Sequence, residues 1–187
     1  MYEIRTLATI NLSSPSSASD GSATNHLYYV ISGKGHVTLG GKGQEFIPDC
    51  LLALPPGGAA SLQPSTMSRV LVIHIPADTS LPPPLPSLTS LPDILGSVRD
   101  VDWSGGRELG KSRRFLVRAD GFNCSVNLVN ASPGVTQGMQ YVRHREGGYV
   151  ISGDITYTWE DGGKEVRVPI RNEFFLCAAF MNSINFN

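Results

Sequence analysis

The sequence lacks long apolar runs and any excess of charge of one sign. No hydrophobic run approaches the roughly 18 residues that a membrane-spanning helix requires. The 15 basic and 16 acidic residues leave a net charge of −1, without the long charge runs that favour nucleic-acid or membrane-surface binding. We therefore expect neither a nucleic acid nor a membrane as a partner.

Cysteine is also scarce. Cys50, Cys124 and Cys177 lie far apart and without CxxC spacing, so the sequence predicts reduced, buried thiols rather than a disulfide framework or a zinc site. The N-terminal residues Met-Tyr-Glu-Ile-Arg lack the basic and apolar regions of a signal peptide. Together these features favour a cytoplasmic protein.

No window of a dozen residues shows the apolar period of an α-helix. Short apolar runs separated by glycine and proline are present instead, at 27–31, 36–39, 51–54 and 69–75. We expect an edge strand within residues 3–12, a loop over 13–25, and hairpin turns at 33–35 and 40–43. Short strands with this punctuation predict an all-β sandwich or barrel.

One pattern occurs twice in the chain. It reads His26-Leu-Tyr-Tyr-Val-Ile-Ser-Gly33 in the first half and Glu146-Gly-Gly-Tyr-Val-Ile-Ser-Gly153 in the second, and a strand of alternating residues follows each. Between them, residues 79–100 are rich in proline, which fits a semi-rigid linker better than a central strand. The predicted organisation is residues 1–78, a linker over 79–100, and residues 101–187.

These repeated stretches resemble the cupins, which are small β-barrels with a ligand pocket inside. Tyr29-Val-Ile-Ser-Gly33 and Tyr149-Val-Ile-Ser-Gly153 are similar to the cupin strand-Gly-strand motif, and Pro48–Gly57 is similar to the second cupin motif. The resemblance implies two tandem cupin-type barrels. The second half is more similar to ectoine synthase, from Ser112-Arg-Arg-Phe-Leu-Val through Asp120-Gly-Phe and Ser125 to Gly153.

The resemblance also implies where a metal would lie. Ectoine synthases hold iron with a Glu, a Tyr and a His, and the matching positions here are Glu146, Phe174 and Asn182. The two histidines of a more typical cupin correspond to Met139 and Tyr141. In the first half, His26 stands at the motif's Glu position and Ala60 at its His position. We therefore expect no metal cofactor in the second half.

Candidate catalytic residues are Glu146, His144 and Tyr141. Glu146 and His144 lie two residues apart, hence on one face of an extended strand, and together could move a proton. Tyr141 could donate to a substrate oxygen. The competing interpretations are a salt bridge of Glu146 with Arg143 or Arg145 at the rim, and a tyrosine that only packs.

The candidate substrate-binding residues are less specific. Ser112 matches a substrate-contacting serine of the resembled family, and Asn182 could donate a hydrogen bond from a former ligand position. The aromatic residues Tyr157, Trp159 and Phe174 could wall a pocket, although isolated aromatics more often belong to a core. His74, on an apolar strand, is expected to be a core histidine.

These residues favour an enzyme of small-molecule biosynthesis that closes a ring or eliminates water, a cyclase or lyase working by acid/base chemistry. The alternatives are a non-catalytic ligand-binding cupin and a metal enzyme with unusual ligands. The second half shows no equivalent of strand 69–75, and an unpaired sheet edge favours a covering partner. A homodimer is therefore possible, with a small molecule as the other partner.

Overall fold

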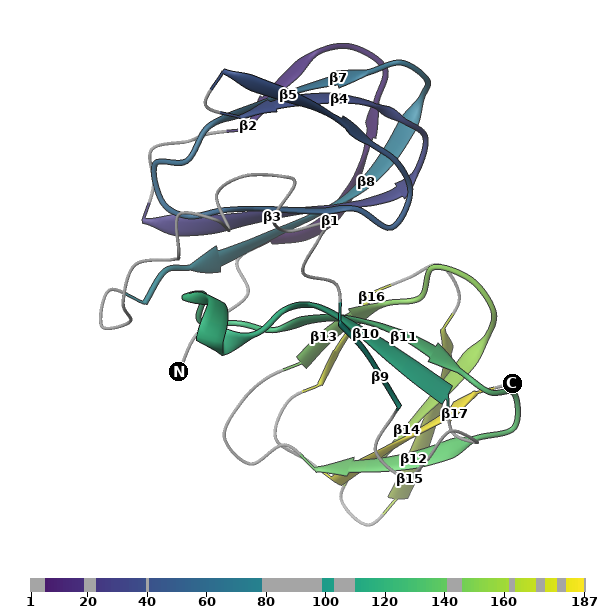
Figure 1. Ribbon diagram of the computed structural model, residues 1–187. Coiled ribbons are helices and arrows are strands. Elements are labelled where there is room, and N and C mark those ends of the chain that lie inside the picture. The colour runs from purple at the N-terminus through teal and green to yellow at the C-terminus, as the bar shows by residue number, and fades with distance from the viewer. Residues whose placement is uncertain are drawn as a thin grey trace. The chain divides into compact units, whose positions relative to one another are not determined.

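The computed structural model describes residues 6–18, 23–39, 41–78, 99–102, 110–140, 146–161, 164–170, 174–177 and 181–186. Within them, the regular elements are β-strands and one 3₁₀ turn, η3 (Arg118–Asp120), shown in Figure 1. The predicted all-β class is therefore confirmed for the described residues. No helix in the described part of the chain is long and apolar enough to cross a membrane.

The chain divides into two compact units. The N-terminal unit comprises residues 4–100 and 113–128, and the C-terminal unit comprises 1–3, 101–112 and 129–187. This division groups residues 113–128 with the N-terminal unit, whereas the predicted boundaries put them in the second half. Of the predicted linker, residues 79–98 lie outside the described part of the chain, and strand β9 begins at Arg99.

Two antiparallel four-stranded sheets face each other in the N-terminal unit (Figure 1). The first sheet has the order β1 (Thr6–Leu12), β8 (Ser68–Pro76), β3 (Thr24–Ser32) and β6 (Leu51–Leu54). The second has the order β2 (Ser16–Ala18), β7 (Ala60–Pro64), β4 (Gly35–Leu39) and β5 (Lys42–Phe46). The edge position of β1 and all four apolar strands agree with the sequence prediction. The predicted loop over 13–25 is wrong in part, because it contains β2 and the start of β3.

The core of this unit lies between the two sheets. It consists of alternate residues of the facing strands, among them Tyr28 and Val30 on β3, Val37 on β4, and Val70 and Val72 on β8. These positions follow the period of two that directs alternate side chains to one face of a strand. We call this surface of each sheet the inward face.

The turn at Gly33 carries the chain from one sheet to the other, so the predicted hairpin there is wrong. Strand β3 pairs with β6 and β8, whereas β4 pairs with β5 and β7. Gly33 has φ of 89°, and a Cβ at this position would come within 2.5 Å of the Ser68 Cα. Glycine is therefore required both by conformation and by space. The predicted hairpin at 40–43 is confirmed, since Leu39 pairs with Lys42.

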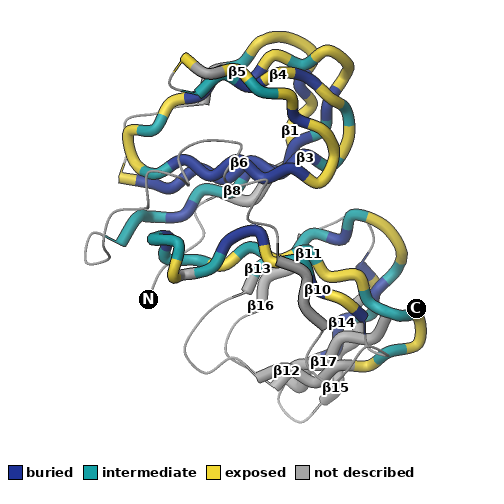
Figure 2. Tube along the Cα trace, viewed as in Figure 1, coloured by how far each residue is buried: buried dark blue, intermediate teal, exposed yellow. Residues whose placement is uncertain are grey.

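The outward face of β3 is buried as well, as the continuous dark tube in Figure 2 shows. Residues 113–128 supply contacts there. The rings of Tyr29 and Phe115 meet edge to face with centroids 5.7 Å apart. The Asn25 side-chain amide donates to Asn123 Oδ1 at 2.8 Å, and Asn123 in turn donates to the Pro76 carbonyl at 2.7 Å. This is why the segment belongs to the N-terminal unit.

Strands that follow in the chain form three further sheets. The order of the largest is β12 (Thr136–Gln140), β17 (Met181–Phe186), β14 (Ile155–Asp161) and β15 (Lys164–Ile170). The others are β13 (Glu146–Tyr149) with β16 (Phe174–Cys177), and β11 (Val126–Ala131) with β10 (Gly110–Leu116) and β9 (Arg99–Asp102). Strands β14 and β15 pair antiparallel, and their terminal pair is Asp161 and Lys164.

Candidate site in the C-terminal unit

The strand pairing of the C-terminal unit repeats that of the N-terminal unit residue by residue. Aligning Gly33 with Gly153 makes β13 the counterpart of β3, β14 of β4, β16 of β6 and β17 of β7. The order β12-β17-β14-β15 then repeats β2-β7-β4-β5. Gly33 and Gly153 share a positive φ, 89° and 79° respectively. The repeat therefore shows which positions of the second half correspond to core positions of the first.

Glu146 is the counterpart of His26. In the first half His26 pairs with Leu54, and in the second half Glu146 pairs with Cys177, which is the counterpart of Leu54. His26 lies on the inward face of β3 with only 4% of its surface exposed. Val150 has the same strand parity as Glu146 and is also buried, with 7% exposed. Glu146 therefore has, in the strand pairing, the position that His26 has in the N-terminal unit.

Tyr157, Trp159 and Asn182 share one face of the largest sheet. Trp159 lies directly opposite Asn182, and Tyr157 lies opposite Ile184. The pair Trp159 and Asn182 corresponds to Leu39 and Ala60 in the first half, and the pair Tyr157 and Ile184 corresponds to Val37 and Leu62. Ala60, Val37 and Leu62 are core residues. Tyr157 is 7% exposed, and Ile155 and Ile170, on the same face, are buried too. The register thus puts the predicted positions Tyr157, Trp159 and Asn182 on one face of this sheet.

Phe174 lies elsewhere. It is opposite Tyr149, and it is the counterpart of Leu51, which occupies the outward face of β6 between the core residues Cys50 and Leu52. Three positions separate Tyr149 from Glu146, so strand alternation places the two on opposite faces. The register does not bring Phe174 or Tyr149 to Glu146.

Ser112 is a buried residue of β10 with 7% of its surface exposed, in the sheet β11-β10-β9 rather than in the sheets of Glu146 and Trp159. Tyr141 and His144 lie outside the described residues. Sequence reasoning did not single out Thr158, which is buried on the outward face of β14 and whose hydroxyl has no hydrogen-bond partner among the described residues.

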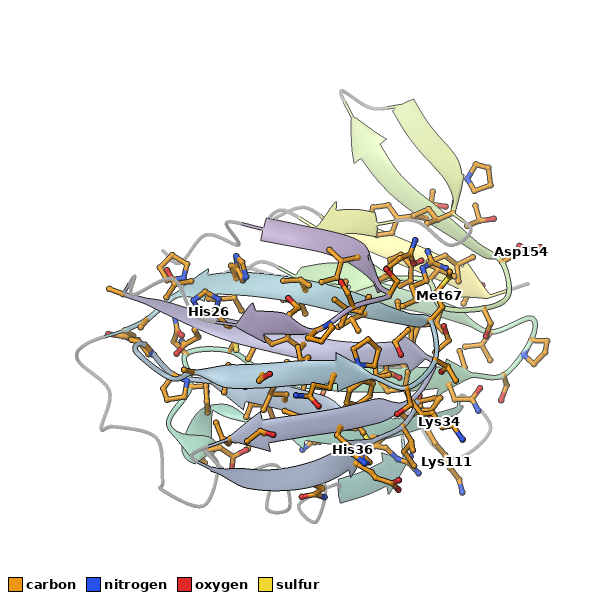
Figure 3. The ribbon with its side chains drawn as sticks, turned by 90° about the horizontal axis from the view of Figure 1, so that it is seen from above. His26, Lys34, His36, Met67, Lys111 and Asp154 are labelled. Atoms are coloured by element: carbon orange, nitrogen blue, oxygen red, sulfur yellow. The ribbon has the colours of Figure 1, made fainter. Side chains whose placement is uncertain are left out.

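His26 has a second imidazole beside it. His74 of β8 is its direct cross-strand partner, and the ring centroids lie 4.5 Å apart in an edge-to-face arrangement. Figure 3 shows His26 at the end of the strands opposite from Lys34, His36 and Met67. His74 is partly buried on the inward face, as expected for a core histidine. The corresponding strand of the second half is not found among the described residues.

Two of the three positions that match the resembled family's iron ligands, Phe174 and Asn182, carry residues that do not suit a transition metal. Phenylalanine offers no donor atom, and a neutral amide is a poor substitute for imidazole at an iron or zinc site. Within the described part of the chain, no group of three His, Cys, Asp or Glu side chains could hold a metal ion.

Comparison with known proteins shows the fold. No protein-family model matches the chain, and no curated protein matches it. Among solved structures, a glyoxylate-induced protein from Pseudomonas aeruginosa superposes with a TM-score of 0.72 at 18% identity over 95% of this chain and 67% of its own. A cupin 2 conserved barrel domain protein from Leptotrichia buccalis gives 0.50 at 10% identity, covering 97% of this chain and 83% of its own.

The fold is that of the cupins. Bacillus subtilis oxalate decarboxylase, which contains Mn(II) centres, also has it, with a TM-score of 0.64 at 15% identity. The chain spans 64% of that enzyme's length, and 95% of the chain is covered. The resemblance to cupins drawn from the repeated motif is thus confirmed at the level of fold. None of these cupins is described as an ectoine synthase.

Proposed function

We propose that the chain is a small-molecule enzyme built as two cupin-type barrels, with its site in the C-terminal unit. The observation that supports the proposal is the pairing of Glu146 with Cys177, which repeats the pairing of His26 with Leu54 in the N-terminal unit. A carboxyl group among apolar and aromatic residues can serve as a general acid or base.

The N-terminal unit supports the proposal by contrast. Its inward face carries a continuous apolar core that includes Tyr28, Val37, Leu62 and Val72. Ala60 and Leu39 of the N-terminal unit correspond to Asn182 and Trp159 of the C-terminal unit. At these two positions the C-terminal unit therefore has an amide residue and a tryptophan where the N-terminal unit has an alanine and a leucine.

The reaction that best uses these residues is a ring closure with loss of water. An amine nitrogen of the substrate attacks a carbonyl carbon of the same molecule, and a C–N bond forms. Both nitrogen-bound protons pass to the carbonyl oxygen by way of Glu146, assisted by His144 or Tyr141. The oxygen leaves as water when the C=N bond forms, so atoms and charge balance without a redox partner.

The alternative is a ligand-binding cupin without catalysis, and one experiment separates the two. The purified protein is incubated with a metabolite extract, and small molecules are followed by mass spectrometry. We expect one species to be consumed and a product lighter by one water to accumulate over time. A binding protein would instead retain an unaltered molecule through gel filtration and consume nothing, and that result would overturn the proposal.

A further inference from the structure

We infer that the outward face of β3 is a docking surface for residues 113–128, and that this docking holds the two halves of the chain together without the predicted linker. We call residues 113–128 the docking segment. The chain before residue 79 and the chain after residue 98 would then stay associated as two separate polypeptides. The inference does not depend on the proposed function, because it concerns how the chain is held together.

The path of the chain gives the first support. The docking segment belongs to the N-terminal unit, whereas the residues on both sides of it, 101–112 and 129–187, belong to the C-terminal unit. Both changes of unit fall inside strands, β10 and β11, which are neighbours in one sheet. Because paired strands are held by backbone hydrogen bonds, the docking segment is not joined to its neighbours by loose loops. Whatever fixes this segment to the N-terminal unit therefore also fixes the second half of the chain.

Apolar side chains anchor the docking segment. Phe115, Leu116 and Phe122 are fully buried, and the ring of Phe115 meets that of Tyr29 on the outward face of β3. Burial of side chains of this size stabilises an association by withdrawing apolar surface from water, and the aromatic pair adds to it. Undocking would expose Phe115 and Tyr29 to water together.

Hydrogen bonds give the docking a fixed position along the sheet. Asn25 is buried on the outward face of β3, and its side-chain amide donates to Asn123 Oδ1 at 2.8 Å. The Asn123 amide donates to the Pro76 carbonyl at 2.7 Å, and Pro76 of β8 pairs with Thr24 of β3. One side chain of the docking segment thus bridges two neighbouring strands. Removing it would leave the buried Asn25 amide without this acceptor, which is costly.

The docking segment also has a turn that is held by its own hydrogen bonds. The Val117 backbone N–H donates to Asp120 Oδ2 at 2.9 Å, and the Asp120 N–H donates to the Val117 carbonyl at 2.9 Å. These bonds close the 3₁₀ turn η3 between the anchors Phe115 and Phe122. A segment that is already in its bound conformation loses less conformational freedom on docking.

The test cuts the chain between its halves and asks whether the pieces stay together. A flexible insert that carries the site of a sequence-specific protease is placed between Ser87 and Leu88 of the full chain, and cleavage is followed to completion on a denaturing gel. At micromolar concentration, gel filtration with light scattering should then show one particle with the mass of the uncut protein. Two smaller particles would overturn the inference.

Variants of the cut protein identify what holds the pieces. The piece that contains β3 carries a fluorescent label, and the dissociation constant of the two pieces is measured by anisotropy in a dilution series. Phe115→Ala should raise this constant at least about a hundredfold, and Asn123→Ala should raise it about tenfold. Asn127→Ala, at an exposed position of the docking segment, is the matched control and should leave it unchanged.

The remaining outcomes also decide the inference. If Phe115→Ala and Asn123→Ala dissociate no more readily than Asn127→Ala, other contacts hold the pieces together and the inference is wrong. If circular dichroism shows that uncut Phe115→Ala does not fold, the comparison of Asn123→Ala with Asn127→Ala decides it alone.

Discussion

Glu146 occupies the position in the C-terminal unit that His26 occupies in the N-terminal unit, seen in their matching cross-strand partners Cys177 and Leu54. The same position of the strand pairing thus holds a histidine in one half and a glutamate in the other. In the first half the imidazole meets a second one, His74. The two halves share this strand pairing, and the position of His26 and Glu146 is one of those at which their residues differ.

The counterpart glycines provide a test of the repeat. Gly33→Ala and Gly153→Ala both place a Cβ at positive φ, which costs about 1–2 kcal/mol. At Gly33 the new atom also meets the Ser68 Cα at 2.5 Å and the Met67 carbonyl at 2.6 Å, whereas at Gly153 no described residue lies within 4 Å of it. We expect the loss of unfolding free energy in urea to be roughly 2–5 kcal/mol for Gly33→Ala and clearly smaller for Gly153→Ala. Equal losses would contradict this account.

Tyr29 and Asp49 provide a test of how the turn before β6 is held. The Tyr29 hydroxyl donates to Asp49 Oδ1 at 2.5 Å, and Asp49 has φ of 66°, the one positive value among described non-glycine residues. Tyr29→Phe should cost roughly 1–2 kcal/mol in urea unfolding, because the hydrogen bond has a charged acceptor at a partly exposed position. Asp49→Asn, which tolerates positive φ, should cost less than Asp49→Ala. The reverse order would show that the bond is not what holds the turn.

The same pair predicts a loss of stability in alkali. Burial, and then the hydrogen bond and charge of Asp49, raise the pKa of Tyr29 above its ordinary value of 10.0. A raised pKa in the folded state means that the stabilising contribution is complete below pH 10 and falls as the unfolded chain begins to lose the phenol proton. Between pH 10 and 12, the wild type should therefore lose stability faster than Tyr29→Phe. Parallel curves for the two proteins would contradict the assignment.

Much of this fold follows from local patterns that the sequence displays. The apolar runs at 27–31 and 69–75 form β3 and β8. The repeated strand-Gly-strand motif indicated the corresponding strands of the two halves. The turn at Gly33 could not be assigned, because the same glycine conformation serves a hairpin and a crossing between sheets. Residues 113–128 were placed with the wrong half, since their partners Tyr29, Asn25 and Pro76 are distant in sequence.

Some features of the candidate site could likewise be predicted from the sequence, and others could not. The alternation of Tyr157 and Trp159 was visible in the sequence, but β17, which places Asn182 opposite Trp159, was missed. Its residues Met-Asn-Ser-Ile-Asn-Phe have few of the branched apolar side chains that mark a strand, although they do alternate. Phe174 was grouped with Glu146 because no register between β13 and β16 was known. The register places it opposite Tyr149 instead.

The metal content of the purified protein provides a further test. With Phe174 and Asn182 at two of the three positions that correspond to the resembled family's ligands, one carboxylate is too few for a stable iron or zinc site. We expect elemental analysis to find far less than one equivalent of any transition metal in the second half. One equivalent of iron or zinc that is lost on Glu146→Ala would contradict this expectation.

The central claim is that Glu146 moves the proton in the reaction, and the turnover number tests it most directly. With the substrate identified from the metabolite extract, kcat is measured at saturating substrate for the wild type, Glu146→Gln and the exposed control Glu45→Gln. Saturation removes any effect of the substitution on affinity. We predict that Glu146→Gln lowers kcat by ~10²–10⁴-fold while circular dichroism shows an intact fold and Glu45→Gln keeps the parent rate. A Glu146→Gln protein that turns over at the parent rate would contradict the claim.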